Sequence, residues 1–548
     1  MTDRPVQPTA NPLTGQAAPG AQSLVGLAYQ AGLNATRRLH RDEQKQLGQY
    51  MTPAAIAHRM ADRATADLHG RLLRILDPAA GTGVLAFAAV EALLRQPAPP
   101  ARIELMLCEI DDRLHDSLES GCAELRKRCA AVGVALDTHI SGGDFLLSGL
   151  ALAQRPCVDL VIANPPYFKL GKSDPRARAH AYAVHGQPNI YGLFMAACAG
   201  LVRPGGVWCF ITPRSWTGGD YFAAVRRHVF ARLQLRALHA FDSRTEHFGD
   251  DEVLQEALIV WAQSAATSGH VEISTSAGVA DMARAAVRRV PLDAVLRRGD
   301  AHRLHLPSDR RGLETLTESF ASLGLKVFTG PVVAFRAKAW LSADPGADTV
   351  PMLWMQHVQR MALQWPMARK LEHLRADAAS AWMLVPNQVM VLLRRFSPKE
   401  DVRRVTAAPC LAEWRADRLG IENHLNCIAP VGRTMSCREA IGLAAFLNSR
   451  PVDEHLRAVS GHTQINASDL RMLPMPDLAG LLAIGARVGD GRSLVCIDAA
   501  VDAVLGTRLS LAEPGGHRSF RLGMAVIGGI GFTSAPVSPN IASFIRRR

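Results

Sequence analysis

The sequence predicts an α/β fold, in which a Rossmann-like, mainly parallel sheet is followed by a second domain of mixed α+β structure. Three observations support this prediction. At 548 residues the chain is too long for one hydrophobic core. From about residue 45 to 265, short apolar runs alternate with longer helical patterns, as in sheets that helices cover on both faces. From about residue 300 to 505, short strands and short helices mix without a repeat.

The elements of the first domain follow from apolar runs and helical periodicity. Continuous apolar runs predict strands that are buried on both faces. These runs are Leu72–Leu76, Ile103–Cys108, Val158–Ala163, Val207–Ile211, Leu235–Phe241 and Ala257–Trp261. The helical patterns among them are Val84–Leu94, Leu114–Ala131, Tyr191–Leu201 and Tyr221–Leu233.

Composition suggests the domain boundaries. Residues 1–40 are rich in Pro, Ala, Gln, Gly and Thr without periodicity, which predicts a disordered segment. We assign residues 41–265 to the first domain and residues 301–505 to the second. Residues 266–300 are small and polar, then basic, and are predicted to connect the two. Residues 506–548 are rich in Gly, Pro and Ser and end in three arginines, and we have no physical account of this tail.

Charge and cysteine usage narrow the class of protein. The formal net charge is +12, and arginine clearly outnumbers lysine. A basic chain favours a polyanionic partner, although a genome that simply prefers arginine is the alternative. The ten cysteines include no Cys-x-x-Cys pair, so no zinc or other metal site is predicted. Without a signal-peptide pattern or an apolar run of the ~18 to 20 residues that a membrane span needs, we expect a cytoplasmic protein with no membrane partner.

The carboxyl end of the first strand carries a glycine-rich turn. In a parallel sheet, ligands bind at this end of the strands. The strand runs into Asp77-Pro78-Ala79-Ala80-Gly81-Thr82-Gly83 and then directly into a helix. Gly81 and Gly83 let the backbone turn tightly and approach a ligand. A carboxylate at Asp77 repels a pyrophosphate but attracts the ammonium group of an amino acid, although an ordinary strand–turn–helix connection is the alternative.

Two further strand ends complete a candidate pocket. Glu109 can accept two hydrogen bonds from a ribose diol, and Ile110 can pack on an adenine face. Asp144 offers an acceptor for an adenine amine, with Phe145 as an apolar wall. Each feature alone is common in turns. In this order along the chain, they describe a site for an adenosine that carries an amino acid, and S-adenosylmethionine fits that description.

The predicted strand Val158–Ala163 runs into Asn164-Pro165-Pro166-Tyr167. The prolines end the strand and remove two N–H donors, which leaves carbonyl oxygens free to accept. The Asn164 side-chain oxygen and the Pro165 carbonyl can together accept both hydrogens of an amine, which exposes the nitrogen lone pair to a sulfonium methyl group. Tyr167 offers a flat face for a base drawn out of a duplex. A turn with a packed tyrosine is the alternative.

Together these motifs resemble the gamma class of amino DNA methyltransferases, in particular the adenine-N6 enzymes of type II restriction–modification systems. The resemblance covers about residues 45–475. It implies that Asn164–Tyr167 is the catalytic motif. It also implies cofactor contacts for the loop from Asp77 to Gly83, and for Glu109, Ile110, Asp144, Phe145 and Asn164.

The same resemblance adds residues outside these strand ends. Asn189, in the segment Gln187–Tyr191, stands where many members of the class carry Asp. Phe248 resembles the aromatic residue that packs on the other face of the flipped base. The segment Gln49–Pro53 resembles the family's N-terminal motif, which closes over the cofactor, and this resemblance implies cofactor contacts for Tyr50, Thr52 and Pro53.

The second domain resembles the target-recognition domain of one subgroup of this class. Three segments carry this resemblance: Leu323–Val333, Leu392–Glu400 and Ser460–Asn466. Basic and amide side chains in this domain are expected to contact DNA phosphates or base edges, although solvated charges or structural hydrogen bonds are the alternative for each. The DNA-binding candidates are Arg336, Lys338, Arg394, Arg395, Lys399, His462 and Gln464, followed by Arg403, Arg404 and Asn466.

The resemblance implies a site-specific enzyme that methylates N6 of a flipped adenine in double-stranded DNA. Its methyl donor would be S-adenosylmethionine, and a cognate restriction endonuclease acting separately is a possible partner. The alternatives are an RNA or protein-glutamine N-methyltransferase with the same Asn-Pro-Pro-Tyr chemistry, and cytosine-N4 methylation, whose enzymes more often carry Ser in place of Asn164. A non-catalytic DNA-binding protein on the same fold would be distinguished by a cofactor-binding assay.

Overall fold

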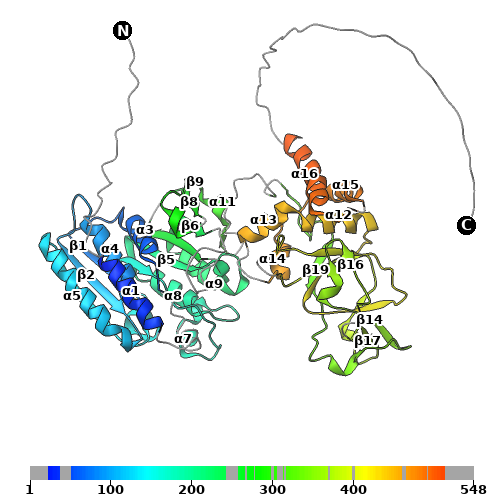
Figure 1. The fold of residues 1–548 in the computed structure, drawn as a ribbon, viewed down its shortest axis with the longest axis horizontal. Helices are drawn as coiled ribbons and strands as arrows, with labels where there is room; N and C mark the ends of the chain where they lie inside the picture. Colours follow the sequence, from blue (N-terminus) through cyan, green and yellow to red (C-terminus); the bar gives the residue numbers. More distant parts are fainter. Residues whose placement is uncertain are drawn as a thin grey trace, which may run out of the picture.

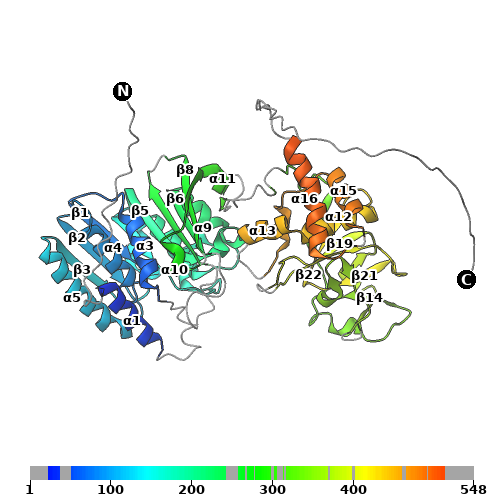
Figure 2. The same cartoon turned by 45° about the horizontal axis from the view of Figure 1, so that its top comes forward.

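Two lobes make up the part of the chain that the structure describes. The computed structural model describes residues 23–37, 51–241, 257–265, 268–276, 278–297, 302–304, 313, 316–367, 371–397, 401–459, 464–489 and 491–511. Figure 1 shows an N-terminal lobe coloured blue to green and a C-terminal lobe coloured green to red. Figure 2 shows the helix α13 (Arg450–Val459) where the two lobes approach each other.

One nine-stranded sheet forms the centre of the N-terminal lobe, in the order β3-β2-β1-β4-β5-β7-β6-β8-β9. Its strands are β1 (Leu72–Asp77), β2 (Arg102–Cys108), β3 (Ala135–Ser141), β4 (Val158–Ala163), β5 (Val202–Pro213), β6 (Leu233–Phe241), β7 (Ala257–Ser264), β8 (His270–Ser276) and β9 (Val287–Pro291). All neighbours from β3 to β5 are parallel, whereas β7 is antiparallel to both β5 and β6. The predicted α/β fold with a Rossmann-like, mainly parallel sheet is confirmed.

Helices bury both faces of this sheet. Successive side chains of a strand point to opposite faces, so in β1 Ile75 packs into one core and Leu76 into the other. The first core receives side chains from α1 (Leu24–Thr36), α3 (Ala54–Thr65), α4 (Val84–Leu94), α5 (His115–Ala131) and α10 (Val279–Met282). The second receives them from α6 (Gly149–Ala153), α8 (Ile190–Ala199), α9 (Ala223–Phe230) and α11 (Leu292–Val295). The short α7 (Pro175–Ala179) follows the segment Asn164–Tyr167 in the chain.

The predicted disorder of residues 1–40 is wrong for residues 24–36, which form α1. Leu24, Val25 and Ala28 lie on one face of this helix and are buried in the first core. The spacing of these three residues is that of an amphipathic helix, and the composition of the whole segment conceals it. The remaining residues of this segment lie outside the described residues, apart from Ser23 and Arg37.

The predicted connector at residues 266–300 is also wrong, because β8 and β9 extend the sheet through most of it. Val271 and Ile273 of β8 are buried, and their neighbours Glu272 and His270 are more exposed. This alternation is typical of a half-buried strand, which a search for continuous apolar runs overlooks. The sheet of the first domain therefore continues to residue 291, beyond the expected boundary at 265.

The C-terminal lobe combines small sheets with a helical layer, as the predicted mixed α+β domain requires. A four-stranded sheet has the order β12-β22-β19-β20 and a five-stranded sheet the order β13-β17-β14-β21-β18. The strands of these two sheets are β12 (Leu325–Thr329), β13 (Leu341–Ser342), β14 (Thr349–Leu353), β17 (His373–Arg375), β18 (Leu384–Pro386), β19 (Met390–Arg394), β20 (Ala407–Cys410), β21 (Arg418–Ile421) and β22 (Leu425–Pro430). The short pair β15 (Val358–Gln359) with β16 (Ala362–Leu363) also lies in this lobe. The pair β10 (Leu296–Arg297) with β11 (Arg303–Leu304) belongs instead to the N-terminal lobe, because Leu296 and Leu304 are buried in its second core.

The helical layer of this lobe contains α12 (Cys437–Asn448), α13, α14 (Ala467–Arg471), α15 (Leu478–Val488) and α16 (Leu494–Leu511). The backbones of α12 and α15 lie so close that a Cβ atom on Gly442 would be 1.9 Å from the Leu481 carbonyl oxygen. Since α16 continues to Leu511, the second domain extends past the expected boundary at residue 505. No helix in the described ranges is both long enough and apolar enough to cross a membrane.

Candidate active site

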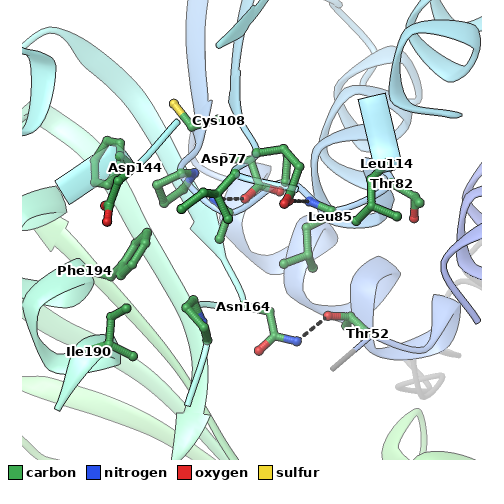
Figure 3. Close-up of a pocket in the computed structure, with 18 of the residues that line it drawn as sticks. Thr52, Asp77, Thr82, Leu85, Cys108, Leu114, Asp144, Asn164, Ile190 and Phe194 are labelled. Carbon is green, nitrogen blue, oxygen red and sulfur yellow. Dashed lines mark hydrogen bonds between the residues drawn. The ribbon is translucent and has the colours of Figure 1, made fainter. Parts of the chain in front are cut away.

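A pocket opens at the carboxyl ends of β1, β2 and β4 (Figure 3). The predicted residues that line it are Thr52, Asp77, Ala79, Gly81, Glu109, Ile110, Asp144, Phe145, Asn164 and Pro166. They come together because the strand order reverses between β1 and β4, so that the loops after these neighbouring strands diverge and leave a crevice. Figure 3 shows Asn164 and Thr52 on one side of the pocket and Asp144, Phe194 and Ile190 on another.

The glycine-rich turn is shaped by two residues with positive φ. Gly81 (φ 55°) and Gly83 (φ 88°) occupy the left-handed region, which side chains rarely adopt. The Gly81 amide faces the pocket and donates to Glu109 Oε2 at 2.7 Å. Gly83 lies away from the pocket lining, where a Cβ atom would be 2.4 Å from the ring of Phe87. Gly81 therefore shapes the ligand site, and Gly83 permits the packing of α4.

Asp77 is a buried carboxyl group at the floor of the pocket. It is only 1% exposed, and burial, opposed by a hydrogen bond from the Ala79 amide, raises its pKa to about 8. The nearby Glu109 carboxylate contributes to the same rise. A cation bound here would lower this pKa again, because it favours the charged form. The site is thus suited to an ammonium group.

Glu109 is buried beside Asp77 and accepts two backbone hydrogen bonds. Its Oε2 accepts from the Gly81 amide, and its Oε1 accepts from the Asp111 amide at 2.8 Å. Burial raises the Glu109 pKa, and these two bonds oppose the rise. Each carboxylate oxygen keeps a second lone pair, so Glu109 can still accept from hydroxyl groups. Ile110, which is 56% exposed, lies at the pocket lining as an apolar surface.

Asp144 and Phe145 form the far end of the pocket. Asp144 Oδ1 accepts from the Leu146 amide at 2.9 Å, and its Oδ2 lies 3.7 Å from Arg176 Nη1. Phe145 is buried and stacks on Phe194 with ring centroids 5.5 Å apart. One acceptor beside an apolar wall is suited to a purine with an exocyclic amine.

Asn164 is held by one side chain from a distant segment and one from its own motif. Its Nδ2 donates to Thr52 Oγ1 at 2.9 Å, and its Oδ1 accepts from the Tyr167 hydroxyl. That hydroxyl also lies 3.0 Å from the Ile211 carbonyl oxygen of β5, and the Tyr167 ring meets Tyr191 edge-on at 5.9 Å. These contacts fix the orientation of the Asn164 amide, and with it the position of the amide oxygen, which is a hydrogen-bond acceptor.

The remaining predicted site residues lie elsewhere. Pro53 stands at the N-terminus of α3, and Pro165 and Tyr167 are not part of the pocket lining. Asn189 caps α8, and its buried Oδ1 has no hydrogen-bond partner among the described residues. Tyr50 and Phe248 lie outside the described residues.

Several lining residues were not predicted from the sequence. The aromatic Phe168 directly follows the predicted motif Asn164–Tyr167, and this adjacency could have identified it. No sequence pattern indicated Arg176 as a site residue, because the path of the loop before α7 brings it to the pocket. Its guanidinium pairs with Asp174 at 2.8 Å and lies 5.7 Å from the centroid of the Phe168 ring. The others are Val84, Leu85, Cys108, Leu114, Gly143, Ile190 and Phe194. The pocket is also lined by Met51 of the segment Gln49–Pro53 and by Pro78, Ala80 and Thr82 of the predicted loop Asp77–Gly83.

The DNA-binding candidates of the second domain have different surroundings. Arg394 Nε donates to the Val358 carbonyl at 2.7 Å, and burial lowers its pKa. Arg395 reaches the Asn423 carbonyl, and Gln464 pairs with the backbone of Phe396. Arg403 pairs with Asp498, while the Arg404 amide donates to Asp453 and Asn466 forms hydrogen bonds with Asp469. Arg336 and Lys338 are exposed, and Lys399 and His462 lie outside the described residues.

Comparison with known proteins identifies relatives over most of the chain. A family model described as Eco57I restriction-modification methylase matches residues 147–248. The Type II methyltransferase M.BsuBI of Bacillus subtilis is 32% identical over 459 residues, which cover 81% of this chain and 90% of that protein. M.PstI of Providencia stuartii, also a Type II methyltransferase, is 30% identical over 82% of this chain and 90% of its own length. Among solved structures, the type IIL restriction-modification enzyme MmeI in complex with DNA is 12% identical, covers 88% of this chain and 75% of its own, and gives a TM-score of 0.44, a likeness too weak to bear on function.

Proposed function

Since the chain belongs to the Type II methyltransferases of restriction–modification systems, we propose that it transfers a methyl group from S-adenosylmethionine to N6 of a flipped adenine in double-stranded DNA. The observation that carries this proposal is the position of Asn164, with an oriented amide oxygen, at the edge of a pocket with buried carboxylates. No observation favours an RNA or a protein glutamine as substrate. We also propose that the methylation protects DNA against a cognate endonuclease that acts separately.

The pocket fits S-adenosylmethionine group by group. Asp77 would hold the ammonium group, because a cation offsets the cost of ionising this buried carboxyl. Glu109 would accept from the ribose hydroxyls, and Asp144 from the adenine amine. Ile110 and Phe145 would pack on the adenine ring. When bound, S-adenosylmethionine supplies an electrophilic methyl group on a sulfonium sulfur.

The catalytic motif would prepare the amine for attack. The Asn164 side-chain oxygen and the Pro165 carbonyl each accept one hydrogen of N6, which draws the nitrogen towards tetrahedral geometry. The Thr52 and Tyr167 hydroxyls hold the Asn164 amide in one orientation, so its acceptor is preorganised. The nitrogen would form its new bond to the methyl carbon as the bond between that carbon and sulfur breaks, with the electron pair of the broken bond remaining on sulfur. The surplus proton of the amine leaves to solvent afterwards. Tyr167 and Phe248 would stack on the two faces of the flipped base.

Long-read sequencing that detects modified bases tests the proposal directly. DNA is taken from methylation-free cells that express the wild type or Asn164→Ala. We expect N6-methyladenine at one short motif with the wild type and none with the variant, which should still bind S-adenosylmethionine in calorimetry. Methylation by Asn164→Ala at the wild-type level would refute the catalytic assignment. A soluble, cofactor-binding wild type that leaves adenine unmodified would refute the substrate.

A further inference from the structure

The turn from Val333 to Trp340, between β12 and β13, presents an apolar ring and two cations to solvent. Phe335 is 76% exposed, and Arg336 and Lys338 are exposed beside it. The Arg336 guanidinium lies 5.4 Å from the centroid of the Phe335 ring. Among the described residues the structure records no ion pair for either cation. By contrast, Arg403 forms an ion pair with Asp498, and Arg395 donates a hydrogen bond to the Asn423 carbonyl.

The residues that lead into the turn are held by backbone hydrogen bonds and close packing. Val332 is buried, and its amide and carbonyl are bonded to the Ile421 carbonyl and the Asn423 amide. A Cβ atom on Gly330 would lie 2.2 Å from the Glu422 carbonyl oxygen, so the strand before the turn is packed directly against that segment.

Contacts within and after the turn hold its far end. The Arg336 and Ala337 amides both donate to the Val333 carbonyl, and the buried Ala337 packs in the same core as Val332. The Trp340 indole donates to Asp377 at 3.2 Å. The ring of Phe335 is therefore held outward by a fixed backbone, and its exposure does not arise from a loosely packed loop.

A large exposed aromatic residue flanked by unpaired cations is complementary to one class of partner. Duplex DNA offers stacked base faces for the ring, and it offers phosphates on both sides for the cations. A protein surface would more often present apolar area over several residues, whereas here the apolar contribution of the turn is concentrated in one ring.

We propose that the Val333–Trp340 turn is a DNA-contact element in which Phe335 inserts between base steps of the duplex while Arg336 and Lys338 bind adjacent phosphates. This inference rests on the proposed function, because it takes double-stranded DNA as the substrate. It goes beyond it by assigning a stacking residue outside the catalytic lobe. Inserted apolar side chains unstack a base step and bend the duplex, which would assist the flipping of the target adenine.

Kinetics with Phe335→Ala, Phe335→Trp and Val402→Ala test the stacking role, since Val402 is equally exposed at 76% in the same lobe. The substrate is plasmid DNA from methylation-free cells, with tritiated S-adenosylmethionine. Phe335→Ala should lower kcat/KM for DNA about ten-fold or more, whereas Phe335→Trp should stay within about three-fold of the wild type. Val402→Ala should match the wild type, and the cofactor Kd should be unchanged in all variants.

Three outcomes would overturn the stacking role. Phe335→Ala could show the wild-type kcat/KM, Phe335→Trp could be as impaired as Phe335→Ala, or Val402→Ala could lose as much as Phe335→Ala. A wild type that incorporates no label refutes the proposed function and removes the premise of this inference. An active wild type beside an equally active Phe335→Ala refutes the inference alone.

The salt dependence of binding to a fragment of the same plasmid tests whether Arg336 and Lys338 contact phosphates. Each lost phosphate contact should reduce the slope of log K against log salt concentration by about 0.9. We expect this reduction for Arg336→Gln and for Lys338→Gln. The control Lys127→Gln removes an exposed lysine on α5 of the other lobe and should leave the slope unchanged. Unchanged slopes in the first two variants would contradict the phosphate contacts.

Discussion

At the scale of single residues, Asp77 combines deep burial with a ligand-facing position. Its pKa is raised from 3.8 to about 8, mainly by burial. Between these values the folded, cofactor-free protein holds a proton that the unfolded chain releases. Because the folded state binds more protons in this window, the free energy of unfolding falls as the pH rises from about 4 to about 8.

The variant Asp77→Asn should remove this pH dependence. Measured by urea unfolding at pH 5, 6, 7 and 8, the difference in unfolding free energy between variant and wild type should grow by up to about 1.4 kcal/mol per pH unit. The exposed Asp116 on α5 provides a control, and Asp116→Asn should run parallel to the wild type. Parallel curves for Asp77→Asn as well would show that the pKa of Asp77 is not raised.

Arg176 is expected to position the acceptor at the adenine end of the pocket. It lies between Asp144, Asp174 and the ring of Phe168. Arg176→Gln should weaken S-adenosylmethionine binding by about five- to ten-fold, since one charge-assisted contact is lost, while kcat at saturating cofactor changes little. Arg176→Lys should restore binding only in part, because an ammonium group cannot reproduce the guanidinium fork.

Calorimetric titration of these variants gives the cofactor Kd. The matched control is Arg178→Gln, which removes an exposed arginine from the same short helix, α7. Equal losses of cofactor affinity in Arg176→Gln and Arg178→Gln would mean that binding depends on the net charge of α7 and not on the position of Arg176.

At the scale of elements, α1 packs against segments that line the pocket at the carboxyl ends of β1, β2 and β4. The Thr82 hydroxyl of the glycine-rich turn donates to the Ala28 carbonyl at 2.7 Å. A Cβ atom on Gly32 would be 2.5 Å from the Met51 sulfur, and Met51 lines the pocket. α1 is thus packed against the segments that shape the ligand site.

Truncating Val25 on the buried face of α1 should therefore lower the free energy of unfolding more than truncating Leu27 on its exposed face. Val25→Ala removes two buried methyl groups and should lower the unfolding free energy by about 2 kcal/mol. Leu27, which is 44% exposed, is the control, and Leu27→Ala should change it by less than about 0.5 kcal/mol. Urea unfolding measures both, and equal values would mean that α1 is not docked on the sheet in solution.

At the scale of the whole molecule, the two lobes have separate cores. The clusters of buried apolar residues in the N-terminal lobe end at Leu304, and those in the C-terminal lobe begin at Leu313. Among the described residues no such cluster contains members from both sides. The lobes should therefore unfold as separate cooperative units.

Scanning calorimetry should accordingly show two transitions, only one of which responds to the cofactor. S-adenosylmethionine at a hundred times its Kd should stabilise the N-terminal lobe by about 2.7 kcal/mol and move that transition upward. The other transition should stay in place, and Asp77→Asn should reduce the shift of the first. One transition that moves as a whole would mean that the lobes are coupled more tightly than their cores indicate.

The sequence by itself determined the parts of this protein that local order encodes. β4 is apolar apart from Asp159, and its bounds are those that the apolar run predicted. The polar residues after β1, β2 and β4 were expected to share a site, because parallel strands present their carboxyl ends at one edge of the sheet. Asp77, Glu109 and Asn164 do line one pocket.

Only the tertiary structure decided features that depend on partners distant in the sequence. The composition of residues 1–40 did not indicate α1, and the alternation of polar and apolar residues in β8 did not indicate that the sheet continues there. Both elements gain their stability from packing against other elements, which the local sequence does not show. Arg176 reaches the pocket through a loop whose course no periodicity encodes. Arg394 and Arg336 are both arginines in the second domain, yet one is bound to the Val358 carbonyl and the other is exposed, since the fold alone determines which carbonyl lies within reach of each guanidinium.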